Sequence, residues 1–268
     1  MRVLVIGGTG TLGRPLARQL QAEGATVRLL SRQPAPPGTQ TEWAQGDIVT
    51  GEGLAAAMQE VDVVIHAAHD PRHPKRDLEG VRQVISAAQH AGIGHFVYVS
   101  IVGAADMPGL PYYRAKAEGE RLVSGAPLST TMFRASQFFE FVAATLGQLD
   151  RLPILPLPAG ARLQPVSVDE VAAALAEHVL RGGPDRLVGP EVLTLRDLAQ
   201  TWQAARGRIR RLVPFSLPHP ALRALAQGAL TSADAPRGAL RWSEWLAGWT
   251  AGTTMPGPAV APRGAGTR

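Results

Sequence analysis

The chain opens with a short apolar run that is followed at once by three evenly spaced glycines. Val3–Ile6 has the β-branched, apolar character of a buried strand, and residues 14–21 have helical periodicity. Between them, glycines allow the backbone to turn tightly and to approach a ligand, while a helix N-terminus offers free N–H groups and a positive dipole end. The stretch therefore predicts a pyrophosphate-binding turn, formed by Gly7, Thr9, Gly10, Thr11, Leu12 and Gly13.

Strand-like and helix-like segments alternate from residue 2 to about residue 134. This alternation predicts an α/β fold with a doubly wound parallel sheet. Right-handed crossovers would place the carboxyl ends of all its strands on one rim. After the first strand we expect strands at 26–30, 41–44, 61–66, 95–100 and 128–134, and helices at 52–59 and 77–91.

The end of the second expected strand bears on the choice of dinucleotide. Sites for NAD place an acidic residue there for the ribose 2′-OH, whereas NADP sites use Arg for the 2′-phosphate. This chain has Ser31 and Arg32 and no acid at that point, and Arg14 could be a second phosphate partner. We therefore expect NADP(H), with NADPH preferred over NADH.

Two further segments are expected to touch the same ligand. Asp47 and Ile48 follow the third strand, where Asp47 would lie near the adenine edge. Ala67 and Ala68 end the fourth strand, and their small side chains suit the close passage of a cofactor in the crevice of an open α/β sheet.

A Tyr–Lys pair forms the most suggestive chemical group. Tyr112 and Lys116 stand at i and i+4 in a segment that Pro111 introduces as a helix, so they share a face. A cation beside a phenol is expected to lower its pKa and to make it a usable acid or base at a carbonyl oxygen. All basic residues but Lys75 and Lys116 are Arg, and two of the three Tyr lie here. This usage favours a functional Tyr–Lys pair over a chance pair on the surface. Tyr113 is the alternative acid, at i+3 from the same lysine.

Composition and charge bear on several other classes of protein. The chain has no Cys, which excludes disulfides and thiolate chemistry. It has no apolar run of membrane-spanning length and no signal-like start, so we expect a cytoplasmic protein without a membrane partner. The net charge of +5 is spread along the chain, which favours a solvated Arg-rich surface over a nucleic-acid partner. His66, His69 and His73 lack a ligand pattern, and we expect no metal.

Taken together, these residues resemble the short-chain dehydrogenase/reductase superfamily, in its extended or atypical, NmrA-like NAD(P)-binding branch. The resemblance runs over about residues 1–205 and includes Phe133–Phe138 and Pro165–Ala172. It implies a Rossmann-type fold, a nicotinamide cofactor, Tyr112 as proton donor, Lys116 as its partner and ribose contact, and Ser100 as a third polar group. The family often has Ser or Thr after Ser100, where this chain has Ile101.

The last third is expected to form a small, mostly helical, substrate-facing region. We place a nucleotide-binding domain at 1–150, this region at 151–250, interleaved with the first, and a disordered tail at 251–268. Expected elements are a helix from Phe138, an extended 152–158, a helix at 168–181, a strand-like 189–194, a helix through Ala205 capped by Thr194, and helices at 218–230 and 239–249.

Three functions are compatible with these residues. The first is an NADPH-dependent reductase of a carbonyl or quinone-like small molecule. The second is a non-catalytic NADP-binding sensor, and the third is a nucleotide-sugar epimerase or dehydratase, for which the C-terminal part is short. A Gly-x-Ser-x-Gly elbow is absent, which argues against a hydrolase. Neither the substrate nor the choice between monomer and homodimer follows from the sequence.

Overall fold

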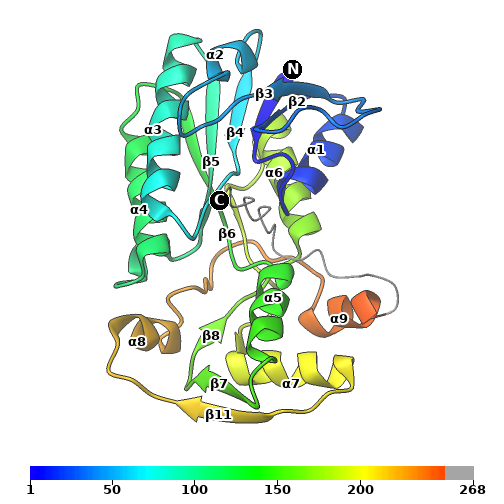
Figure 1. The fold of residues 1–268 in the computed structure, drawn as a ribbon, viewed down its shortest axis with the longest axis vertical. Coiled ribbons are helices and arrows are strands. Elements are labelled where there is room, and N and C mark those ends of the chain that lie inside the picture. The colour runs from blue at the N-terminus through cyan, green and yellow to red at the C-terminus, as the bar shows by residue number, and fades with distance from the viewer. Residues whose placement is uncertain (251–268) are drawn as a thin grey trace, which may run out of the picture.

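A seven-stranded parallel sheet organises the molecule (Figure 1). The computed structural model describes residues 1–250. The strands of the sheet are β1 (Arg2–Ile6), β2 (Thr26–Ser31), β3 (Glu42–Gln45), β4 (Val63–His66), β5 (His95–Ile101), β6 (Thr130–Ala135) and β9 (Arg186–Leu187). Their order is β3-β2-β1-β4-β5-β6-β9, and each neighbouring pair is parallel. The order reverses between β1 and β4, which is where a doubly wound sheet opens its ligand crevice. The expected fold class is confirmed.

Helices cover both faces of the sheet. They are α1 (Gly13–Ala22), α2 (Leu54–Ala57), α3 (Pro74–His90), α4 (Pro111–Ser124) and α6 (Val168–Arg181), with a 3-10 turn, η1, at Ala104–Asp106. Two separate apolar cores result, one between the sheet and α1 and α6, the other between the sheet and α2, α3 and α4. α6 and β9 both come from beyond residue 150, so the nucleotide-binding layer is completed by the last third of the chain.

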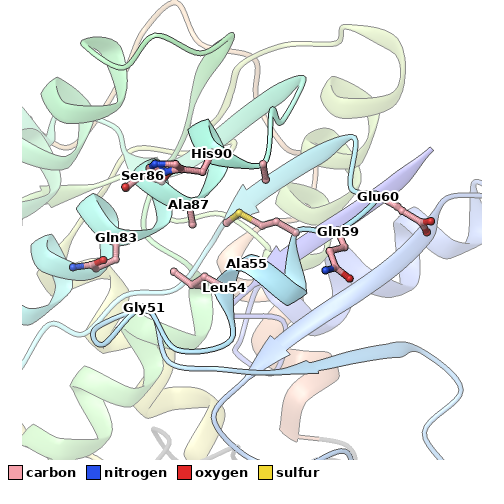
Figure 2. Close-up of a pocket in the computed structure, with 11 residues that line it drawn as sticks. Gly51, Leu54, Ala55, Gln59, Glu60, Gln83, Ser86, Ala87 and His90 are labelled. Carbon is pink, nitrogen blue, oxygen red and sulfur yellow. The ribbon is translucent and has the colours of Figure 1, made fainter.

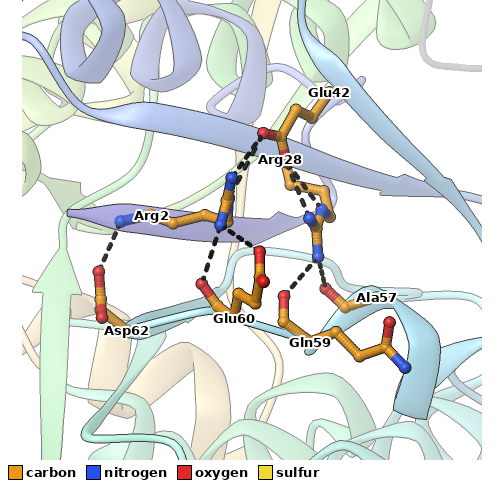
Figure 3. A network of polar contacts seen from close by, with 7 residues as sticks. All are labelled: Arg2, Arg28, Glu42, Ala57, Gln59, Glu60 and Asp62. Carbon is orange, nitrogen blue, oxygen red and sulfur yellow. Dashed lines mark hydrogen bonds and ion pairs between the residues drawn. The ribbon is translucent and has the colours of Figure 1, made fainter.

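A charged network holds the amino ends of the first strands together (Figure 3). Glu42 on β3 accepts hydrogen bonds from the guanidinium groups of Arg2, at 3.3 Å, and Arg28, at 3.0 Å. Arg28 also donates to the carbonyls of Ala57 and Gln59, and Arg2 pairs with Glu60. These ion pairs join the edge strand to β1, β2 and the turn after α2. They lie at the end of the strands opposite to the glycine turn, so these ion pairs stabilise the sheet and take no part in the crevice.

The remaining elements form a second region below the sheet in Figure 1. They are α5 (Phe139–Leu149), β7 (Ile154–Pro158), β8 (Arg162–Leu163), β10 (Leu193–Thr194), α7 (Leu195–Arg206), β11 (Arg211–Phe215), α8 (Pro220–Ala226) and α9 (Trp242–Thr250). Their shared core includes Phe139 and Trp242, both buried. Trp245 stacks on Trp242 and Trp249 stacks on Trp245, with ring centroids 5.4 and 5.7 Å apart, so these three rings pack against one another.

Several expected boundaries shift for local reasons. Gly51 and Gly53 both have positive φ, so the helix expected from 52 begins only at Leu54. The helix expected at 218–230 ends at Ala226, because Gly228 adopts a positive φ of 81°.

Hydrogen bonds to other groups shift two more boundaries. The amides of Ala239 and Leu240 donate to the Glu170 carboxylate, so the last helix starts at Trp242. The strand expected from 61 starts at Val63, because the Val61 amide bonds back to Met58 in a turn.

Other expectations hold closely. α6 has the expected bounds, and Thr194 caps α7 in a reciprocal capping box with Asp197. The strand-like 189–194 is strand only at Leu193–Thr194. The tail expected to be disordered, 251–268, lies outside the described residues. Within residues 1–250 no helix combines the length and apolar character needed to cross a bilayer.

Candidate active site and dinucleotide crevice

The glycine turn is packed backbone against backbone. A Cβ on Gly13 would lie 2.2 Å from the Gly7 carbonyl oxygen, and one on Gly7 would lie 2.6 Å from the amide nitrogen of Ala68. Gly7 also has φ of +85°, which disfavours any residue with a side chain. The close approach of β1 and β4 at the point where the strand order reverses therefore depends on these glycines.

The outer side of the same turn suits an anion. Thr9, Gly10 and Thr11 are exposed, and no side chain caps the amino end of α1, whose N-cap residue is Leu12. The first amides of a helix have no partner within the helix, so they are available to a phosphate. The turn thus fits the pyrophosphate of a dinucleotide.

The adenosine side of the crevice carries one free cation. Within residues 1–250, no hydrogen bond or ion pair engages the exposed guanidinium of Arg32, at the end of β2. The Arg14 guanidinium is held by the Thr9 carbonyl at 2.8 Å, so it braces the glycine turn. Ser31 Oγ accepts from the Gln33 amide.

Asp47 and Ile48 form the next segment of this side. Asp47 Oδ1 accepts from the Val49 amide at 2.8 Å. The Ile48 side chain packs on α3, where a Cβ at Gly80 would lie 2.9 Å from it. Ala67 continues the strand ladder, its amide bonding to Ile6. The structure thus brings the expected cofactor-binding residues to the carboxyl rim of β1, β2 and β4.

Tyr112 and Lys116 lie on α4, but their contacts differ from the sequence-based expectation. Lys116 is buried, and its ammonium donates to the Val99 carbonyl at 3.2 Å and lies 4.8 Å from the centre of the Tyr98 ring. The Tyr112 ring lies beside those of His69 and Tyr113, at centroid distances of 6.1 and 5.4 Å. The lysine thus points to β5.

The electrostatics follow from this arrangement. Burial raises the pKa of Tyr112, and the neighbouring Tyr113 and Asp77 raise it further. The expectation that Lys116 lowers this pKa is therefore wrong for this structure, because the ammonium is turned to the Val99 carbonyl. Burial raises the pKa of Tyr113 to about 12, and burial lowers the pKa of Lys116 against the opposing effect of Asp77.

Ser100 follows Val99, whose carbonyl accepts the lysine's hydrogen bond, along β5. It is buried on β5, in register with Arg134 on β6, and its hydroxyl has no hydrogen-bond partner among the described residues. His66 ends β4 with its ring edge-on to Tyr98, at 5.6 Å. Burial lowers its pKa to about 3, so its imidazole is neutral at physiological pH.

One buried polar residue received no role in the sequence analysis. Gln137 lies two residues beyond β6, and neither atom of its side-chain amide has a partner within the described chain. Its only sequence signal is that a polar residue stands two positions after a buried strand. Of the phenylalanines that follow it, Phe139 is fully buried and Phe141 is exposed.

A surface hollow lies elsewhere and shares no residue with this crevice. It measures about 470 Å³ and lies between α2 and α3, where Leu54, Met58, Gln83 and His90 are among its lining residues (Figure 2). In residues 1–250 no three His, Asp or Glu side chains gather as a metal would require.

Comparisons with known proteins agree with this geometry. A family model described as NAD(P)H-binding matches residues 7–180. Photosystem II assembly factor Ycf39 of Synechocystis sp. is 37% identical over 164 residues, which cover 58% of this chain and 49% of the relative. The chain thus spans about half the length of the first curated relatives that it matches.

Two further proteins match over more of their length. An NAD(P)H azoreductase of Xenophilus azovorans is 27% identical over 226 residues, 80% of this chain and 77% of the relative. The crystal structure of an NADPH-dependent quinone oxidoreductase from Escherichia coli, complexed with NADPH, superposes with a TM-score of 0.77 at 19% identity, covering 92% of this chain and 99% of that one. The chain belongs to the NAD(P)H-binding family of atypical short-chain dehydrogenases/reductases.

Proposed function

We propose that this protein is an NADPH-dependent reductase that transfers hydride to a carbonyl or quinone-like small molecule, with Tyr112 as the proton donor. The observation that carries the proposal is the grouping at one rim. The glycine turn, the Tyr112 side chain at the start of α4, the buried Lys116 and the unpartnered Ser100 hydroxyl all lie at the carboxyl ends of β1, β4 and β5.

The chemistry divides among these residues. When bound, the reduced nicotinamide supplies the hydride. The Tyr112 phenol, buried and with a raised pKa, keeps its proton at neutral pH and holds it ready for the reduced oxygen. The proton is then replaced from water. The Ser100 hydroxyl is free to hydrogen-bond the same oxygen.

Lys116 would orient the ligand. Its ammonium has three donors, and Val99 takes one of them, so two are available to a ribose hydroxyl. Arg32 is the basis for expecting NADPH, since its guanidinium is free to grip a 2′-phosphate. The names of the relatives support the substrate class: one reduces azo compounds and one reduces quinones.

A non-catalytic NADP-binding sensor is the second candidate. Two observations favour it: Lys116 bonds to Val99 and not to Tyr112, and the 37% identical relative is named as an assembly factor. For the epimerase or dehydratase the support is a likeness of fold alone, since sugar-nucleotide epimerases are among the solved structures that superpose on this chain.

NADPH oxidation against a panel of quinones, azo dyes, aldehydes and ketones separates the two candidates. Turnover with members of the panel, lost in Tyr112→Phe, supports the reductase. Tight NADPH binding without oxidation by any compound would contradict the reductase and support the sensor.

A further inference from the structure

Gln137 is a buried amide that the protein leaves without hydrogen bonds. Its side chain is 7% exposed, and both Nε2 and Oε1 lack a partner in the described part of the chain. Buried side-chain amides in folded proteins nearly always have at least one partner, so an amide with none needs an explanation. A bound ligand is one such explanation.

The neighbouring polar groups are already occupied. Ser136 Oγ accepts from the Gly189 amide at 3.2 Å. Gln164, which is fully buried, donates to the Gly189 carbonyl and accepts from the Ser232 amide, at 2.9 and 2.8 Å. Ser136 and Gln164 are thus satisfied by partners within the protein, whereas the Gln137 amide is not.

The main chain of Gln137 is held in place. Its carbonyl accepts from the Val166 amide at 2.9 Å, and the Val166 carbonyl accepts from the Phe139 amide at 3.0 Å. Phe138 and Val166 form a parallel bridge around these bonds. The side chain is thus carried on a backbone that is fixed on both sides, as a recognition residue requires.

The position in the crevice selects the part of the dinucleotide. The adenosine side is marked by Arg32 at the end of β2, and the phosphates by the glycine turn after β1. The nicotinamide therefore extends to the other side of the switch point, toward β4, β5 and β6. Gln137 follows β6 on that side.

The chemistry of the amide narrows the choice further. Nε2 donates and Oε1 accepts, so both are satisfied only by a group that presents an acceptor and a donor side by side. The carboxamide of nicotinamide is such a group. A quinone or carbonyl oxygen would pair with Nε2 alone and leave Oε1 unsatisfied.

We infer that the Gln137 side chain recognises the carboxamide of the nicotinamide ring through a paired amide–amide contact. This inference rests on the proposed function in one respect, the location of the nicotinamide at this rim. The pair fixes the rotation of the ring about its glycosidic bond, and with it the ring face turned to Tyr112. Gln137 is a positioning residue.

The test compares three ligands. They are NADPH, the reduced 3-acetylpyridine analogue of NADPH, in which a methyl group replaces the carboxamide NH₂, and 2′-phospho-ADP-ribose, which lacks the nicotinamide. Dissociation constants are measured by calorimetric titration for the wild type, for Gln137→Met, and for the control Gln148→Met, which changes an exposed glutamine of helix α5, the helix that follows Gln137.

The wild type should bind NADPH about tenfold more tightly than the analogue, since the analogue leaves Oε1 unpaired. Gln137→Met should lose this preference while binding 2′-phospho-ADP-ribose as the wild type does, and Gln148→Met should keep it. Undiminished preference in a Gln137→Met protein that binds 2′-phospho-ADP-ribose overturns the inference and leaves the proposed function standing. Failure of the wild type to bind any of the three ligands overturns both.

Discussion

The two ends of the crevice differ in whether backbone atoms or side chains line them. The phosphate end consists of backbone: Gly7 and Gly13 approach neighbouring main-chain atoms so closely that a single Cβ would collide with them. The end at β5 and β6 consists of side chains, and Ser100, Gln137 and Lys116 are buried there with hydrogen-bonding capacity to spare. At the phosphate end binding and folding depend on the same atoms, whereas at the other end the chemistry can change while the fold remains.

The sharpest contrast concerns Tyr112. Tyr112→Phe should lower kcat about 100- to 10,000-fold, the usual contribution of a positioned proton donor, because the phenyl ring keeps the packing and loses only the acidic proton. The affinity for NADPH should not change. Stopped-flow kinetics and titration with NADPH measure the two effects on one sample. Unchanged turnover would assign the proton to Tyr113, whose ring lies next to it.

At the backbone end, a single methyl group should damage folding and binding together. Gly13→Ala places a Cβ 2.2 Å from the Gly7 oxygen and should lower the free energy of unfolding by about 3 kcal/mol, with loss of NADPH binding. Urea denaturation and coenzyme titration measure both. Gly125→Ala is the control, since its Cβ would lie 3.4 Å from the nearest atom at a negative φ. A Gly13→Ala protein with wild-type affinity would place the phosphates elsewhere.

Glu140, in the first turn of α5, is a largely buried carboxyl that reduces stability when it is charged. Burial, aided by Asp169, raises the pKa of this carboxyl from 4.5 to about 7. A raised pKa means that the folded protein favours the protonated form, so its contribution is complete below pH 4.5 and is lost as pH rises through 7. Glu140→Gln should therefore exceed the wild type in stability at pH 8 by about 2 kcal/mol, and by little at pH 4. Urea denaturation at both values measures this; a difference independent of pH would contradict it.

The smallest effect concerns Arg32, on the adenosine side of the crevice. Arg32→Gln should weaken NADPH binding about tenfold and leave NADH binding unchanged, since only NADPH carries the 2′-phosphate. Arg223→Gln, an exposed arginine of the distant α8, is the control. Titrations with both coenzymes decide the matter, and equal weakening of the two would show that Arg32 acts on the shared part of the dinucleotide.

The same contrast explains how far sequence reasoning reaches. The glycine turn and the helix at Val168–Arg181 were predictable, because local spacing and periodicity determine them. The direction of the Lys116 side chain was not, because it depends on the Val99 carbonyl, which the fold brings to it from another strand. Likewise, the unsatisfied amide of Gln137 becomes visible only when the partners of its neighbours can be counted.

The crossing of the chain back to the sheet has a consequence for biosynthesis. The core between the sheet and α1 includes Val166, Leu175 and Leu187. In the chain these residues come after α5, which is the first helix of the second region. Until these residues have been synthesised, the face of the sheet beside α1 lacks part of its apolar cover. A chaperone that acts on the nascent chain would therefore bind the apolar face beside α1 until β9 has left the exit tunnel.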